Sequence, residues 1–140
     1  MILIYLRPYM LYTIWLLQQN EFLNQETEKK FLEYIWNRKD GIYYCAGGPL
    51  SNVECLESKS FLTWLSGIEN LSGFSLFPEF MKRGIIDHLL HEVHRLMHEE
   101  VNLPSATPIF GHYSEKWSNR RARKDDLILR IVRVLVKCYQ

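Results

Sequence analysis

One run of eleven residues holds four of the five histidines of the chain: His88-Leu-Leu-His91-Glu-Val-His94-Arg-Leu-Met-His98. At 100° per residue of an α-helix, His91, His94 and His98 fall within about 60° of one another. The apolar residues of the segment share the opposite face: Ile85, Ile86, Leu89, Leu90, Val93, Leu96 and Met97. The acids Asp87, Glu92 and Glu99 fall on the histidine side, with Glu100 at its margin. The pattern predicts an amphipathic helix whose histidines point away from the core.

His94 and His98 are separated by four positions, which lets two imidazoles on one helix reach the same metal ion. A catalytic zinc helix of the HExxH kind needs a glutamate directly after its first histidine, whereas Arg95 follows His94. No third ligand stands out. We therefore expect no metal and no other cofactor. A solvated polar face is the simplest interpretation. The alternatives are a partner-binding face whose charge depends on pH near the unperturbed histidine pKa of about 6.5, and a physiological metal site.

The segment Arg83-Gly-Ile-Ile-Asp-His88 places an arginine five positions before a histidine. This spacing resembles the arginine-x4-6-histidine element of HEPN-type ribonucleases, which are also small helical proteins. The resemblance implies RNA cleavage with Arg83 and His88 as the functional pair. It covers six residues, and Gly84 stands where the family often has a polar residue, so a ribonuclease is kept as an alternative.

A basic cluster, formed by Arg120, Arg121, Arg123 and Lys124, follows a stretch that contains Phe110, His112, Tyr113 and Trp117. Cationic groups neutralise phosphates and aromatic rings stack on bases, so this combination is a candidate nucleic-acid contact. However, two aspartates follow at once, and positive charge is unfavourable at the start of a helix. Nucleic-acid binding through Arg120, Arg121 and Arg123 is therefore a second alternative.

No enzyme class is otherwise indicated. The chain has serines, cysteines and histidines, but no G-x-S-x-G elbow and no cysteine in an activating context. The Gly47-Gly48 pair is not followed by the Lys-Ser/Thr of a phosphate-binding loop.

We expect helices to position these candidate residues. Pro8 suits a first helical turn, Asn24 suits an N-cap, and Gly67 is expected to stop a short helix. Gly84 lies inside the longest helical pattern, 78–102, and lowers its helix propensity. We therefore expect a kink at Gly84 or a helix that begins after it. The expected ranges are 8–19, 24–40, 58–66, 78–102 and 118–139, with a long loop before the last. In that last helix a narrow polar stripe is predicted on an otherwise apolar, mostly buried surface: Arg123, Asp126, Arg130, Arg133 and Lys137.

The fold class that follows is mainly α, a single-domain helical bundle of four to five helices over residues 1–140. A small β-hairpin or an ordered loop is expected near residues 42–56, where short apolar runs flank Gly47, Gly48 and Pro49. Since 140 residues are enough for one core, we expect one domain.

The net charge and the cysteine content limit the classes of partner and the cellular compartment that we expect. The formal net charge is +1, so no global field attracts the chain to a nucleic acid or a membrane. Three cysteines with no metal-type spacing favour reduced thiols, with a Cys45–Cys55 bridge as the alternative. The apolar run 9–17 is shorter than the roughly 20 residues of a membrane-spanning helix. We expect a cytoplasmic protein.

A compact chain with many aromatic residues, no catalytic motif and unpaired thiols resembles the small bacterial immunity and antitoxin proteins that neutralise a cognate toxin. This is a resemblance of type over the whole chain. It implies a protein partner, whose active site one face of the domain would cover. The residues expected to bind that partner are Asp87, His91, His94, His98, Phe110, Tyr113 and Trp117.

Overall fold

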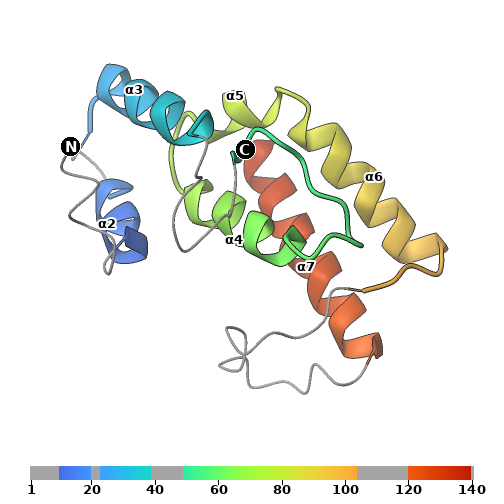
Figure 1. Cartoon of the computed structure of the whole chain (residues 1–140). Helices are drawn as coiled ribbons and strands as arrows, with labels where there is room; N and C mark the ends of the chain where they lie inside the picture. Colours follow the sequence, from blue (N-terminus) through green and yellow to red (C-terminus); the bar gives the residue numbers. More distant parts are fainter. Residues whose placement is uncertain (1–9, 20–22, 39–48, 104–119, 140) are drawn as a thin grey trace.

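The computed structural model describes residues 10–19, 23–38, 49–103 and 120–139 (Figure 1). Within these ranges there are six helices and no strand. The helices are α2 (Met10–Leu17), α3 (Gln25–Trp36), α4 (Phe61–Leu71), α5 (Phe77–Met81), α6 (Ile85–His98) and α7 (Arg120–Cys138). The prediction of a mainly α-helical protein is confirmed.

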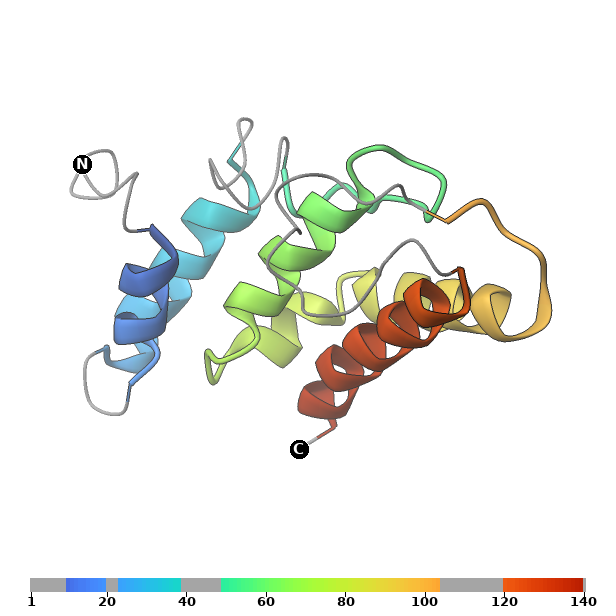
Figure 2. The same ribbon diagram turned by 90° about the horizontal axis from the view of Figure 1, so that it is seen from below.

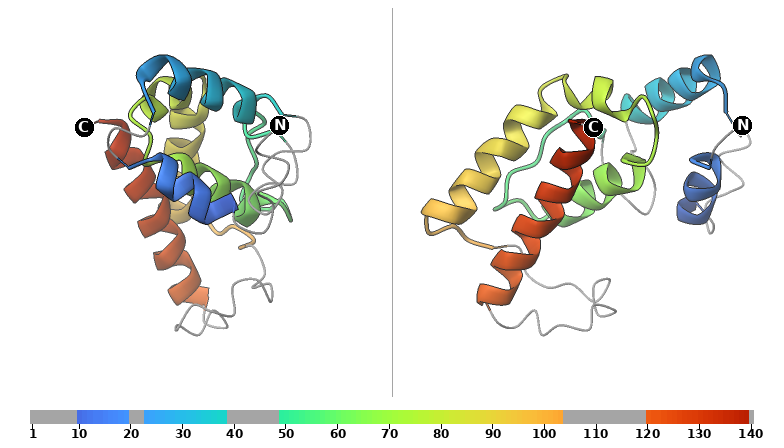
Figure 3. Two further views of the ribbon diagram at one scale, coloured as in Figure 1. Left: turned by 90° about the vertical axis from the view of Figure 1, so that its left-hand side faces the viewer. Right: turned by 180° about the vertical axis from the view of Figure 1, so that it is seen from behind.

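Helix α4 has neighbours on two sides, since it contacts both α2 and α7. Helix α7 also packs against α5 and α6, and α5 packs against α6 (Figure 2). The pair α2 and α3 lies at the end of the molecule opposite to α6 (Figures 1 and 3). Segment 49–60 contains no strand. It runs beside α6, as Figure 1 and the right-hand view of Figure 3 show.

Aromatic side chains supply much of the core. Trp36 of α3 meets Phe80 of α5 edge to face, with ring centroids 5.6 Å apart. The ring centroids of Phe31 and Phe74 are 5.4 Å apart. Burying one such ring contributes about 1.5–3 kcal/mol, so these contacts hold α3 against the α4–α5 region.

The start of α3 forms as its sequence predicts. The Asn24 side chain accepts a hydrogen bond from the Thr27 amide at 2.8 Å, which satisfies one of the unpaired donors of the first turn. Glu28, in the same turn, is buried and accepts from the Ser75 amide at 2.7 Å and the Ser75 hydroxyl at 2.6 Å. This carboxylate ties the start of α3 to the turn after α4.

The predicted helix over 78–102 is two helices in the structure. Gly84 separates them and adopts φ 103°, a left-handed conformation that a side chain disfavours. Of the two outcomes expected at Gly84, a kink or a later start, the later start is confirmed, because α6 begins at Ile85 and the single long helix is not formed.

Gly67 does not stop α4, which continues to Leu71. Ile68 and Leu71 are fully buried, and the free energy of burying them exceeds the roughly 1 kcal/mol by which glycine disfavours a helix. The predicted end of this helix is wrong for that reason.

The predicted polar stripe of α7 does not face solvent throughout. Arg130 is only 6% exposed, and its Nε and Nη2 atoms bind the Glu69 carboxylate of α4 at 2.8 and 2.7 Å. The exposed surface of α7 is instead partly apolar, formed by Leu129, Val132 and Val136. The Glu69 carboxylate pairs with two of the three nitrogens of the buried guanidinium, and a hydrophobic pattern cannot reveal such a partner.

Two further expectations concern the segments at 9–17 and 42–56. The sequence of 9–17 is apolar on nearly all sides, which predicts a buried helix, but Trp15 is 53% exposed, so α2 is not buried on all sides. The described part of the expected hairpin, 49–56, is turn and loop without a strand, and residues 42–48 lie outside the described ranges. Cys55 and Cys138 are free thiols, while Cys45 also lies outside those ranges.

Replacing Gly84 by alanine tests the α5–α6 break. Apart from its two chain neighbours, nothing lies within 4 Å of the added Cβ, so the penalty is that of the left-handed backbone. We expect Gly84→Ala to lower the free energy of unfolding by about 1–2 kcal/mol. Gly84→Asn is the control, because asparagine tolerates this conformation better, and it should lose less. Urea denaturation measures both, and equal losses would contradict the backbone explanation.

Candidate functional site

The outer face of α6 carries four of the seven residues predicted to bind a partner. Asp87, His91, His94 and His98 are all exposed, on the side of the helix that the sequence pattern assigns to them. Two apolar residues that were expected in the core extend this surface, Leu90 at 45% and Met97 at 55% exposure. These six side chains span an arc of about 120° and are called the α6 outer face below.

His94 and His98 are in direct contact. Their ring centroids are 4.6 Å apart and the ring planes are inclined by 49°. His98 is the last residue of α6, and the Glu99 amide donates to the Arg95 carbonyl at 2.8 Å, which closes the helix. Both imidazoles therefore project from one ordered turn.

A buried carboxylate supports α6 from behind. Glu92 is 1% exposed, although its position in the sequence pattern placed it on the outer side. It accepts a hydrogen bond from the Leu56 amide at 2.9 Å and from the Arg95 guanidinium at 3.1 Å. Because Leu56 is itself fully buried, this contact fastens segment 49–60 along the helix.

Arg95 links three carboxylates on the same side of α6. It pairs with Glu57 and Glu92, and its Nε lies 3.7 Å from Glu99. Hydrogen bonds from Arg95 lower the pKa of the Glu57 carboxyl below its ordinary value. The hydrogen bonds that Arg95 donates to Glu57 and Glu92 raise its own pKa. The ion pairs therefore fix the second half of α6 against the 49–60 segment.

The residues of the ribonuclease alternative each have a structural partner. His88 is partly buried, with its Nε2 2.5 Å from the Glu54 carbonyl and its ring 5.7 Å from that of Trp64. Arg83 binds Glu33 through Nη2 at 2.6 Å and covers the ring of Phe80. This pair lowers the pKa of Glu33 and raises that of Arg83.

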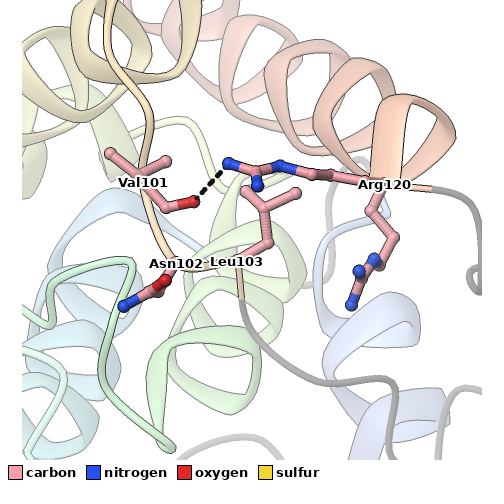
Figure 4. Close-up of a pocket in the computed structure, with 5 residues that line it drawn as sticks. Val101, Asn102, Leu103 and Arg120 are labelled. Atoms are coloured by element: carbon pink, nitrogen blue, oxygen red, sulfur yellow. Dashed lines mark hydrogen bonds between the residues drawn. The ribbon is translucent and has the colours of Figure 1, made fainter.

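The basic cluster lies at the start of α7, where Arg120 is beside residues 101–103, which follow α6. Arg120 donates to the Val101 carbonyl at 3.1 Å (Figure 4). Together with Arg123 these residues line a pocket of about 220 Å³, whose other described walls are Asn102 and Leu103. Ligand-binding pockets usually start at about 300 Å³, so this one does not indicate a small-molecule site. Arg121 is exposed.

Three of the residues predicted to bind a partner, Phe110, Tyr113 and Trp117, lie outside the described ranges. Across the ranges that are described, no group of three or more histidine, cysteine or acidic residues could hold a metal ion. None of the helices in those ranges combines the length and the hydropathy needed to cross a bilayer. Comparison with protein families, curated proteins and solved structures found no match.

Sequence reasoning missed Leu90, Met97 and Glu92. The first two lie at the edge of the apolar arc of α6, where a small rotation of the helix decides between core and solvent. Glu92 is drawn inward by a backbone amide 36 positions earlier in the chain, a partner that no local pattern identifies.

Glu92→Ala should lower the free energy of unfolding by about 3 kcal/mol, because it leaves the buried Leu56 amide without its acceptor and removes one of the carboxylate partners of Arg95. Urea denaturation and the exchange rate of the Leu56 amide measure the effect. Glu99→Gln is the matched control on the same helix, and its exposed ion pair should contribute less than about 0.5 kcal/mol. Similar losses in both variants would show that Glu92 does not carry this attachment.

The Glu57–Arg95 pair should make stability depend on pH. The folded pKa of Glu57 lies below its ordinary value of 4.5, so protonation favours the unfolded state. The contribution is complete above about pH 4.5 and is lost as the pH falls through the lowered pKa. Glu57→Gln should therefore flatten this part of the curve of unfolding free energy against pH.

An Arg95→Gln background provides the control for the pH experiment, because Glu57→Gln should leave its curve unchanged. The effect is small, since the Glu57 side chain is partly exposed. If Glu57→Gln in the native background leaves the unfolding free energy at low pH unchanged, the pair does not have this role.

Proposed function

We propose that this protein acts by binding another protein through the α6 outer face. The observation that carries the proposal is the pairing of two exposed apolar side chains, Leu90 and Met97, with four ionisable residues on one helix surface. Apolar area provides affinity when it is covered, and the surrounding polar groups provide orientation and specificity. Methionine adapts its shape to different partners, which suits it to such a surface.

The contacts behind α6 support the same proposal. Glu92, Arg95 and His88 all attach the helix to segment 49–60, and none of them belongs to the outer face. A helix held in this way loses little conformational freedom when its other side is covered. Preorganisation of this kind increases the affinity for a partner.

The form of binding that we propose is inhibition. The chain would neutralise a toxin as small bacterial immunity and antitoxin proteins do, with the α6 outer face covering the active site of the toxin. Phe110, Tyr113 and Trp117 are proposed to widen the contact. The proposal treats the 140 residues as one cytoplasmic domain, a helical bundle that needs no cofactor.

The exposed apolar residues of α7 offer a second surface against which the proposal can be judged. Leu129, Val132 and Val136 are exposed to between 38% and 49%, against 45% for Leu90, and α7 contains no histidine. They supply a matched control, because a charge introduced there changes the apolar surface of another helix to a similar degree.

The test compares two double variants in a pull-down from the native cell lysate. Leu90→Glu with Met97→Glu should abolish retention of a single stoichiometric protein partner, because it places charge in the centre of the contact. Val132→Glu with Val136→Glu should leave retention unchanged. Both variants should keep the helical circular dichroism of the native chain, since all four side chains are exposed.

A retained partner that is toxic alone and harmless when co-expressed with this protein would support inhibition. Retention lost only in the α7 variant would place the interface elsewhere and contradict the proposal. Co-purifying RNA with no protein partner would favour the nucleic-acid alternative at Arg120, Arg121 and Arg123. Toxicity of the protein itself that disappears in His88→Ala would favour the ribonuclease alternative.

A further inference from the structure

The contact between His94 and His98 has a chemical consequence that does not depend on a protein partner. The two rings stand one turn apart on α6 and are both exposed, with centroids 4.6 Å apart. Metal–nitrogen bonds to imidazole are about 2.0–2.1 Å long, so two nitrogens that share an ion lie within about 4 Å of each other. Side-chain rotation alone can bring the two rings to that separation.

The turn that carries these histidines is fixed by other residues. Leu96, between them, is fully buried, and Arg95 is held by the carboxylates of Glu57 and Glu92. The backbone positions of both histidines are thus set before any ligand arrives. They also lie at the carbonyl end of α6, where the helix dipole favours a bound cation.

Neither imidazole is engaged elsewhere in the described part of the chain, where the contact of each ring is with the other. His88 differs, because its Nε2 is occupied by the Glu54 carbonyl. The nitrogens of His94 and His98 are therefore available as ligands, whereas Nε2 of His88 is already in use.

We propose that His94 and His98 together chelate one divalent transition-metal ion of the zinc, nickel and copper class. Neutral imidazole is a ligand that these ions prefer, whereas magnesium and calcium prefer oxygen. Two ligands from the chain leave the other coordination positions to water or to an external donor. The site is thus an open one, unlike the four-ligand sites that stabilise small zinc domains.

His91 serves to test which histidines form the site. It shares the α6 outer face and lies three positions before His94, so it has the same exposure and chemistry. Within the described part of the chain, the ring of His94 contacts that of His98 and makes no such contact with His91. We therefore assign the ion to the 94–98 pair and not to the 91–94 pair.

Isothermal titration of the full chain with nickel chloride, without a polyhistidine tag and under reducing conditions, tests the proposal. The native chain should bind one ion. His94→Ala and His98→Ala should each weaken binding by about a hundredfold, because a two-point attachment becomes a single one. His91→Ala should bind as the native chain does, and magnesium chloride should give no binding heat.

Thermal unfolding gives a second readout that does not rely on binding heats. Nickel should raise the midpoint of the native chain and of His91→Ala with increasing concentration, because the ion binds only the ordered turn. It should leave the midpoints of His94→Ala and His98→Ala unchanged. The proposal is overturned if the native chain binds no nickel, if either of these variants binds as the native chain does, or if His91→Ala loses binding equally.

Discussion

The burial of Glu92 is the constraint on which the α6 half of the molecule depends. A carboxylate removed from water needs hydrogen-bond donors, and this one finds a backbone amide of segment 49–60 and the guanidinium of Arg95. The amide at Leu56 is equally in need of an acceptor, because its residue is fully buried. Each group thus satisfies the other, and a segment without regular structure gains a fixed place beside a helix.

The same arrangement occurs at two other places in the fold. Glu28 accepts from the amide and hydroxyl of Ser75, and Glu69 accepts two hydrogen bonds from Arg130. In each case a helix contributes the carboxylate and the donor comes from a distant part of the chain. Apolar packing brings the helices together without selecting one orientation, whereas these directional contacts specify which turn of one element faces which turn of another.

The helices themselves could be predicted from local signals. Asn24 caps α3 because its side-chain oxygen reaches an amide three positions later, and the arc of histidines on α6 follows from the period of the helix. The inward turn of Glu92 and Arg130 could not be predicted, because their partners lie 36 and 61 positions away. The prediction that Leu90 and Met97 are buried was wrong for a different reason. Hydrophobic periodicity defines the centre of a buried face more accurately than its edge.

The separation of tasks between the two sides of α6 has a consequence for how this protein can change through evolution. Residues that hold the helix in place, such as Glu92 and Leu96, are buried, while those of the outer face contribute little to the core. Substitutions on the outer face therefore escape most of the selection that preserves folding. A lineage can alter the surface that this helix presents, one exposed side chain at a time, while the scaffold beneath it stays the same.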